Sequence, residues 1–311
     1  MYRYVARRLL ITIPTLFAVL ILVFTIINFL PGDPGRIILG AEATPEAVAM
    51  MNAEFGLDRP YLVRLGDFVF GVVTRFDFGV SWRTRQPVVT ELMNRLPITA
   101  RIALFSVLIA VLIGVPLGVL AAIRRSTITD ASLTVLSMFL MSIPGFVFGL
   151  VLIYVFALRL GVLPTFGAQT WQHYVLPSAT MGLLGAGGYI RFTRVLMLET
   201  VNQEYIKTAR AKGAPEARVI WKHAFKNACL PLINGTMLHF SGLLGGAIII
   251  ETVFSINGIG LTILTAVRSR DLPIVTAGGV ILAVFFLVIV LLIDLLYAFI
   301  DPKIRAKFSS S

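Results

Sequence analysis

The sequence is poor in charge and in the residue types that carry most enzyme chemistry. Only 14% of its 311 residues are charged, against about 25% in an average soluble domain, and 57% are hydrophobic. A single cysteine, Cys229, excludes an intramolecular disulfide, and we expect it to be a small buried side chain. The three histidines, His173, His223 and His239, are not spaced as metal ligands with Cys, Asp or Glu, so we expect structural roles and no metal site.

The sequence also lacks the G-x-x-x-x-G-K-[ST] loop that cradles nucleotide phosphates. Gly258-x-Gly260 is no substitute, because it lacks the strand and helix context of a nucleotide site. We therefore expect no ATP hydrolysis, no cofactor and no enzymatic activity in this chain. The net charge of +11 does not indicate nucleic-acid binding, because the excess lies in loops between apolar segments.

What the sequence does contain is a series of long apolar runs. Runs of about 20 apolar residues are long enough to cross the hydrocarbon core as helices. They predict an all-α polytopic membrane protein with an uncleaved first span. The six predicted spans are residues 9–30, 101–123, 132–158, 176–198, 230–250 and 275–300.

Prolines and glycines modify three of these spans. Pro116, between two glycines, predicts a kink in the second span, and Pro144-Gly145 interrupts the third. The fourth span is rich in glycine, which lets a neighbouring helix approach closely. The closely spaced glycines are Gly182, Gly185, Gly187 and Gly188.

Basic residues set the orientation of the spans. With six spans both termini share one side, and 16 of the 27 Lys and Arg residues, including every lysine, fall on that side. The positive-inside rule makes that side cytoplasmic. The predicted organisation is a cytoplasmic N-terminus with the first helix (1–30), an outer loop domain (31–99), a membrane core (100–300) with a cytoplasmic loop (199–229), and a cytoplasmic tail (301–311).

The outer loop domain contains two predicted helices. Thr44-Pro45-Glu46 is typical of a helix start, with threonine as N-cap and proline at the first helical position. Gly56 is a plausible stop, and an amphipathic helix follows Pro60. The domain is too small for an independent enzyme, so we expect it to form a cap on the outer face.

The longest charged run between apolar blocks is residues 204–231. It predicts a helix ending near Lys212, a left-handed turn at Gly213, and a second helix from Pro215 to Asn227, ahead of the fifth span. Such a helical pair is either a docking surface for a partner or a solvated basic loop that only fixes topology.

Residues 204–227, which we call the coupling segment, resemble the EAA loop of ABC-importer permeases, and more narrowly the dipeptide/oligopeptide/nickel permease family. Lys207-Thr208-Ala209 stands in place of Glu-Ala-Ala, and this branch's His223-x-x-x-Asn227 replaces the usual Ile-Leu-Pro ending. Phe76 departs from the family by replacing a glycine. Further similar stretches are Tyr4-Val5-Ala6-Arg7-Arg8, Leu30-Pro31-Gly32-Asp33-Pro34, Gly56-Leu57-Asp58-Arg59-Pro60, Arg95-Leu96-Pro97-Ile98-Thr99, Glu251-Thr252-Val253-Phe254, Asp271-Leu272-Pro273 and Asp294-Leu295-Leu296-Tyr297.

The resemblance implies an inner-membrane pathway subunit of a type I ABC importer, of the kind with a long first outer loop. It implies four further subunits: a second permease, two cytoplasmic ATPases and an external binding protein. The residues that would contact an ATPase are Glu204, Tyr205, Lys207, Thr208, Ala209, Arg210, Ala211, Lys212, Gly213, Ala214, Pro215, His223 and Asn227. Peptides are the expected cargo; nickel chelates, glutathione and oligosaccharides are alternatives within the family.

Two further expectations concern transport. Candidate pathway-lining residues are Met138, Met141, Ser142, Asn234 and His239. Asp294 is a carboxylate well inside a span, which favours a structural pair with a basic residue or, alternatively, a proton relay. The second possibility would make the protein an ion-coupled secondary transporter; a receptor or scaffold that transports nothing is a further alternative.

Overall fold

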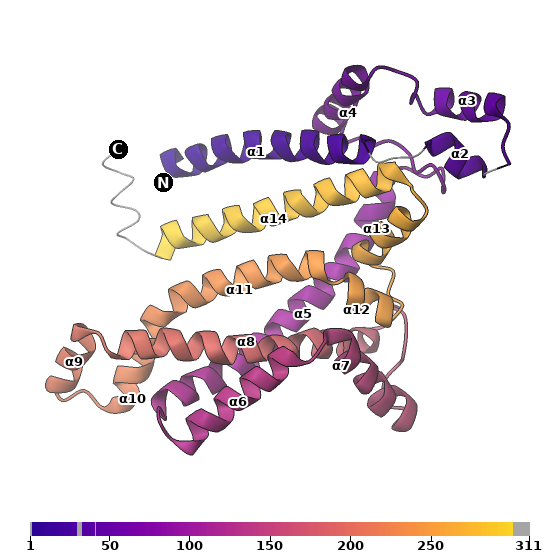
Figure 1. Ribbon diagram of the computed structural model, residues 1–311. Helices are drawn as coiled ribbons and strands as arrows, with labels where there is room; N and C mark the ends of the chain where they lie inside the picture. Colours follow the sequence, from indigo (N-terminus) through magenta and orange to yellow (C-terminus); the bar gives the residue numbers. More distant parts are fainter. Residues whose placement is uncertain (1, 30–32, 41, 301–311) are drawn as a thin grey trace. The chain divides into compact units, whose positions relative to one another are not determined.

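The computed structural model describes residues 2–29, 33–40 and 42–300, and most of them lie in helices (Figure 1). Within this described part there is no named β-strand, only an isolated antiparallel bridge between Val80 and Pro87. The chain forms two compact units, one comprising Met1–Pro97 with Gly258–Ser311 and the other Ile98–Asn257. The all-α prediction is confirmed.

The first unit is built on two long antiparallel helices. α1 (Tyr2–Asn28) and α14 (Leu272–Ile300) pack side by side (Figure 1). Its other helices are α2 (Pro34–Leu39), α3 (Pro45–Glu54), α4 (Tyr61–Arg75), the first turns of α5 (Val88–Ile123) and α13 (Ile259–Arg268). Its apolar core includes Leu20, Val88, Leu92, Ile259 and Ala277.

The predicted helices of the outer loop domain are confirmed. Thr44 caps α3 by accepting a hydrogen bond from the Ala47 backbone N–H at 3.3 Å. α4 begins directly after Pro60 and is attached to α1, where the Tyr61 hydroxyl lies 2.6 Å from Thr25 Oγ1. Aromatic stacking and a hydrogen bond from Arg64 to Asn28 complete this attachment.

Asp271 anchors the end of the outer loop domain to α14. Its buried carboxylate accepts hydrogen bonds from the Ser81 hydroxyl and, at 3.2 Å, from the Trp82 backbone N–H. A buried carboxylate needs such donors, since leaving it unpaired is costly. Asp271-Leu272-Pro273 therefore has a structural role in this unit.

The second unit contains the remaining helices. They are most of α5, α6 (Ile128–Ser142), α7 (Gly145–Leu152), α8 (Val175–Val201), α9 (Glu204–Ala211), α10 (Glu216–Arg218), α11 (Lys226–Gly246) and α12 (Ile248–Val253), with π-helices at Ile153–Arg159 and Val219–Phe225 and a 3-10 helix at Trp171–Tyr174. α6 and the helix that follows it meet at 95°. This bend lies at Pro144-Gly145, where the sequence predicts an interruption.

Glycines let α8 pack backbone to backbone with two neighbouring helices, as predicted. A Cβ atom at Gly182 would lie 2.8 Å from the Ser106 carbonyl oxygen of α5, and one at Gly187 would lie 2.8 Å from the Ser137 carbonyl oxygen of α6. Gly114 and Gly118 of α5 allow the same close approach to α8. The glycines that flank Pro116 are therefore required for contact with α8.

The structure has helical residues outside the predicted spans. α5 begins at Val88, ahead of the span predicted from residue 101, and α13 lies between the fifth and sixth predicted spans. Val88, Leu92 and Ile259 are fully buried. Their burial outweighs the helix-breaking tendency of the nearby Pro97 and Gly260.

A helix is a candidate membrane span if it is long and apolar enough to cross a membrane. Among the described residues, three helical stretches qualify, Leu10–Asn28, Val88–Ile123 and Leu272–Ile293, and the bent pair of α6 and α7 makes a fourth if it is one span. The other two predicted spans coincide with α8 and α11, which do not qualify. The count of six stays a prediction.

Candidate functional site

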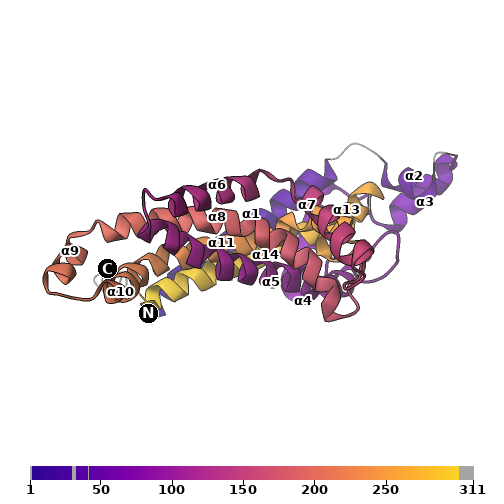
Figure 2. The ribbon, with the colours of Figure 1, turned by 90° about the horizontal axis from the view of Figure 1, so that it is seen from below.

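The coupling segment forms two helical arms with a sharp turn between them. α9 ends at Ala211, Gly213 adopts φ +76°, and α10 begins after Pro215 (Figures 1 and 2). Glycine is favoured there because a left-handed conformation costs other residues about 1–2 kcal/mol. The prediction of helix, glycine turn and helix is correct in this respect.

The second arm differs from the prediction. α10 continues through the π-helix Val219–Phe225 into α11 without a break, so no separate helix ends at Asn227. The Asn227 side-chain amide donates to the His223 carbonyl at 2.6 Å. Because a π-helix displaces carbonyls from their α-helical partners, this hydrogen bond gives Asn227 a structural role, through the backbone of His223 and not its imidazole.

The inner face of the coupling segment is apolar and buried. Ile206, Val219 and Ala224 are fully buried and form one cluster with Met197 of α8 and Val119 of α5. Ala209 and Ala214 pack against the same cluster. The segment is therefore held against two long helices, α5 and α8, and is not a loosely solvated loop.

An ion pair bridges the glycine turn. The Arg210 guanidinium donates to the Glu216 carboxylate from Nη2 at 2.7 Å and from Nε at 3.2 Å. We call this pair the elbow clamp. The bidentate hydrogen bonds from Arg210 hold the pKa of Glu216 below its ordinary value. The clamp therefore stabilises the folded protein at pH values above the carboxyl group's pKa in the unfolded chain. This stabilisation is lost as the pH falls through the lowered pKa of the folded state.

The outer face of the coupling segment is basic and aromatic. Tyr205 and Trp221 are about half exposed. Lys207 pairs with Glu204 at 2.7 Å, and the Thr208 hydroxyl donates to the Glu204 carbonyl. The remaining exposed residues of this face include Ala211, Lys212, Pro215, Arg218, Lys222 and Lys226. An exposed face of this kind, on a buried base, suits docking to another protein.

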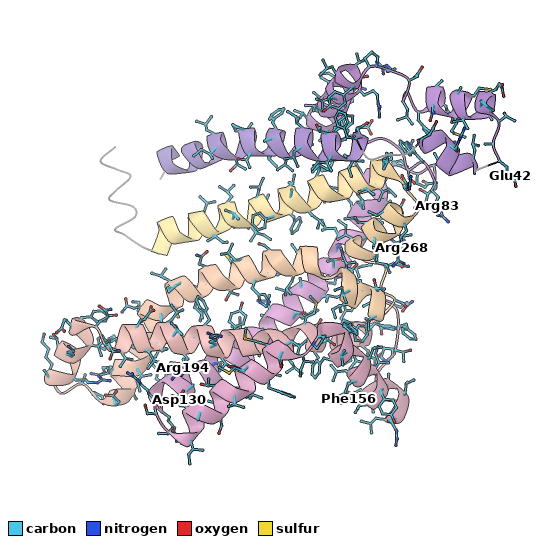
Figure 3. The ribbon with its side chains drawn as sticks, viewed as in Figure 1. Glu42, Arg83, Asp130, Phe156, Arg194 and Arg268 are labelled. Carbon is cyan, nitrogen blue, oxygen red and sulfur yellow. The ribbon has the colours of Figure 1, made fainter. Side chains whose placement is uncertain are left out.

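A buried ion pair links α6 to α8 close to this segment. Arg194 donates to both carboxylate oxygens of Asp130, from Nε at 2.6 Å and from Nη2 at 2.8 Å (Figure 3). Asp130 is 6% exposed and also accepts from the Ser126 backbone N–H. The sequence reading missed this pair, although a charged residue within span four is a signal that a partner exists.

A cavity of about 410 Å³ lies between α6, α8 and α11 in the second unit. Met141 and His239 line it, together with Tyr189, Phe192 and Gly188, which the sequence reading did not single out. Met138, Ser142 and Asn234 are not among its lining residues. The cavity thus brings together two of the five candidate lining residues.

The remaining candidates either form hydrogen bonds that support the fold or have side chains outside the described part of the chain. His173 completes a capping box with Thr170, its Nδ1 lying 2.8 Å from the Thr170 hydroxyl. Glu251, which begins one of the family-like stretches, is fully buried and accepts a hydrogen bond from Thr99. The side chain of Asp294 lies outside the described residues.

Comparison with known proteins connects this geometry to a family. Residues 114–306 match the model of the "binding-protein-dependent transport system inner membrane component", and residues 1–103 match its N-terminal companion. The glutathione transport system permease protein GsiC of Escherichia coli (strain K12) is 39% identical over 307 residues, which is 99% of this chain and 100% of that protein. GsiC of Salmonella choleraesuis (strain SC-B67) is 40% identical over the same shares.

A solved structure supports the fold. Inward-facing MetNI, a methionine ABC transporter, superposes with a TM-score of 0.56 at 20% identity, over 70% of this chain and 99% of that one. At this identity the likeness concerns the type I importer permease fold alone. With both family models matched and full-length relatives near 40% identity, the chain belongs to the binding-protein-dependent transport system inner membrane components, as an ABC-importer permease of the dipeptide/oligopeptide/nickel family.

Proposed function

We propose that this permease forms half of a translocation pathway for short peptides and receives its driving force through the coupling segment. It would act with a second permease, two cytoplasmic ATPases and an external binding protein. The observation that carries the proposal is the form of the coupling segment, whose exposed basic and aromatic face rests on a fully buried apolar base.

The base explains how movement would pass into the membrane core. Ile206 and Val219 of the segment share a cluster with Met197 of α8 and Val119 of α5. Packed interiors resist compression, so displacement of the docked face is transmitted to these helices. ATP binding would then drive the pathway through differential affinity of nucleotide for its two states, and the energy would enter from another subunit.

Glutathione is the first cargo to test. It is a tripeptide, and proteins about 40% identical to this chain are named as glutathione transport permeases. We therefore take short peptides as the cargo class, with glutathione as one member. Nickel chelates and oligosaccharides are the comparison cargoes.

Uptake by the complete importer in proteoliposomes tests the proposal. Radiolabelled glutathione and trialanine should enter only with ATP and the binding protein present, and uptake should survive collapse of the proton gradient by an uncoupler. Uptake without ATP that the uncoupler abolishes would contradict the coupling. Uptake of nickel–histidine or an oligosaccharide, with neither peptide transported, would contradict the cargo class.

A further inference from the structure

The cavity between α6, α8 and α11 is lined without any charged side chain, yet it contains two polar rings. Tyr189 of α8 and His239 of α11 face each other with ring centroids 5.5 Å apart at 59°. The rest of the lining is aliphatic, aromatic or glycine. The cavity therefore offers hydrogen bonds at one place in apolar surroundings.

The polar atoms of this pair are not satisfied within the described part of the chain. Tyr189 is 5% exposed, and its hydroxyl approaches Thr236 without forming a hydrogen bond of good geometry. The Thr236 hydroxyl already donates to the Leu232 carbonyl at 2.8 Å. Nδ1 of His239 is buried and has no hydrogen-bond partner. A buried polar group without a partner costs roughly 1–3 kcal/mol, so two at one cavity indicate a ligand.

Glycines shape the space beside these rings. A Cβ atom at Gly185 would lie 3.0 Å from Cε1 of His239, so the imidazole rests directly on the α8 backbone. A Cβ atom at Gly188 would meet nothing within 4 Å, because that position opens into the cavity. The small residues thus keep the cavity open on the side where the imidazole lies.

We propose that Tyr189 and His239 form a contact site for the peptide group of the cargo. This inference rests on the proposed peptide cargo. A peptide group offers a carbonyl acceptor and an N–H donor, and the tyrosine hydroxyl and the neutral imidazole can each donate and accept. Because no charged residue lines the cavity, the site suits the uncharged backbone of the cargo better than its ionised termini or charged side chains.

A metal ion without a chelator fits this site poorly. The lining provides one imidazole and no carboxylate or thiolate. No group of three or more potential ligands gathers anywhere in the described part of the chain. Because no charged side chain lines the cavity, we expect the site to contact peptides whatever the charge of their side chains.

Substitution of the two rings in the complete importer tests the site. Tyr189→Phe and His239→Leu should each reduce uptake of glutathione and of trialanine by about tenfold, the value of one lost hydrogen bond near 1.4 kcal/mol. Both peptides should be affected alike. His239→Gln, which keeps a donor and an acceptor, should retain most uptake. Assembly with the other subunits and ATP hydrolysis without cargo should stay within about twofold.

A size test uses two glycines with open space around their Cβ positions. Gly188→Leu fills the cavity and should reduce uptake of both peptides, whereas Gly242→Leu, on α11 outside the lining, should leave it unchanged. Normal uptake by His239→Leu and Gly188→Leu would overturn the proposed site. A loss of subunit assembly that parallels the loss of uptake would also overturn it, because the cavity would then be assigned to a partner's side chain. Failure of the proposed function is distinguishable, because wild-type importer would then transport neither peptide.

Discussion

At the scale of single residues, Arg194 shows what a charge inside an apolar helix requires. Its guanidinium forms both hydrogen bonds to Asp130 near the end of α8, and Asp130 in turn lies at the start of α6. The carboxylate also helps to cap α6 through Ser126. One carboxylate thereby satisfies a buried cation and fixes where α6 begins.

Asp130→Asn should destabilise the protein by about 3 kcal/mol, because it leaves the partly buried Arg194 without its counter-charge. The measurement is thermal unfolding of the purified protein in detergent. Asp67→Asn is the matched control, since it breaks the exposed Arg59–Asp67 pair and should change stability by less than about 1 kcal/mol. Equal stability of the two variants would contradict the structural role of the Asp130–Arg194 pair.

At the scale of elements, the turn between α9 and α10 decides the shape of the proposed docking surface. Gly213 supplies a backbone conformation that L-residues avoid, and the elbow clamp holds the two arms together across it. No atom lies within 4 Å of a Cβ placed at Gly213, so a substitution there acts through backbone strain and not through a clash.

Gly213→Val should reduce ATP-driven uptake about five- to thirtyfold, because about 1–2 kcal/mol of strain depopulates the bent conformation by that factor. Gly213→Asn should retain most uptake, since asparagine tolerates positive φ. Gly66→Val on α4 also has open space but no positive φ, and it should behave as wild type. If all three variants transported equally well, the turn would have no part in coupling.

Helix types were easier to predict than helix ends. Thr44 and Pro60 correctly predict the helices that follow them, and Pro144-Gly145 correctly predicts the bend. α5 begins ahead of the second predicted span, because tertiary burial of Val88 and Leu92 carries the helix through Pro97. The π-helix at Val219–Phe225 has no local sequence signal, because it depends on how α11 packs.

At the scale of the whole molecule, the distribution of basic residues predicts one orientation in the membrane. The outer loop domain should face outward, and the coupling segment and both termini should face the cytoplasm. Local motifs predicted the helix, glycine turn and helix of the coupling segment, whereas the contacts of Tyr189 with His239 and of Asp130 with Arg194 join residues distant in the chain and have no local signal.

Thiol labelling of intact cells tests the orientation. In a Cys229→Ala background, a membrane-impermeant maleimide should label Gln86→Cys and leave Lys212→Cys unlabelled; both positions are exposed. Inside-out vesicles should give the opposite result. Labelling of both positions from one side would contradict the predicted topology.

The unbroken run from α10 through the π-helix into α11 makes the docking surface sensitive to chain length. A loop would absorb an inserted or deleted residue, but a helix turns by about 100° for each one. Deletion of the buried Ile220 would therefore aim Arg218 and the preceding arm in a different direction without removing any exposed side chain of the proposed docking surface. Natural variation in this stretch should consist of substitutions on the exposed face, with its length held constant.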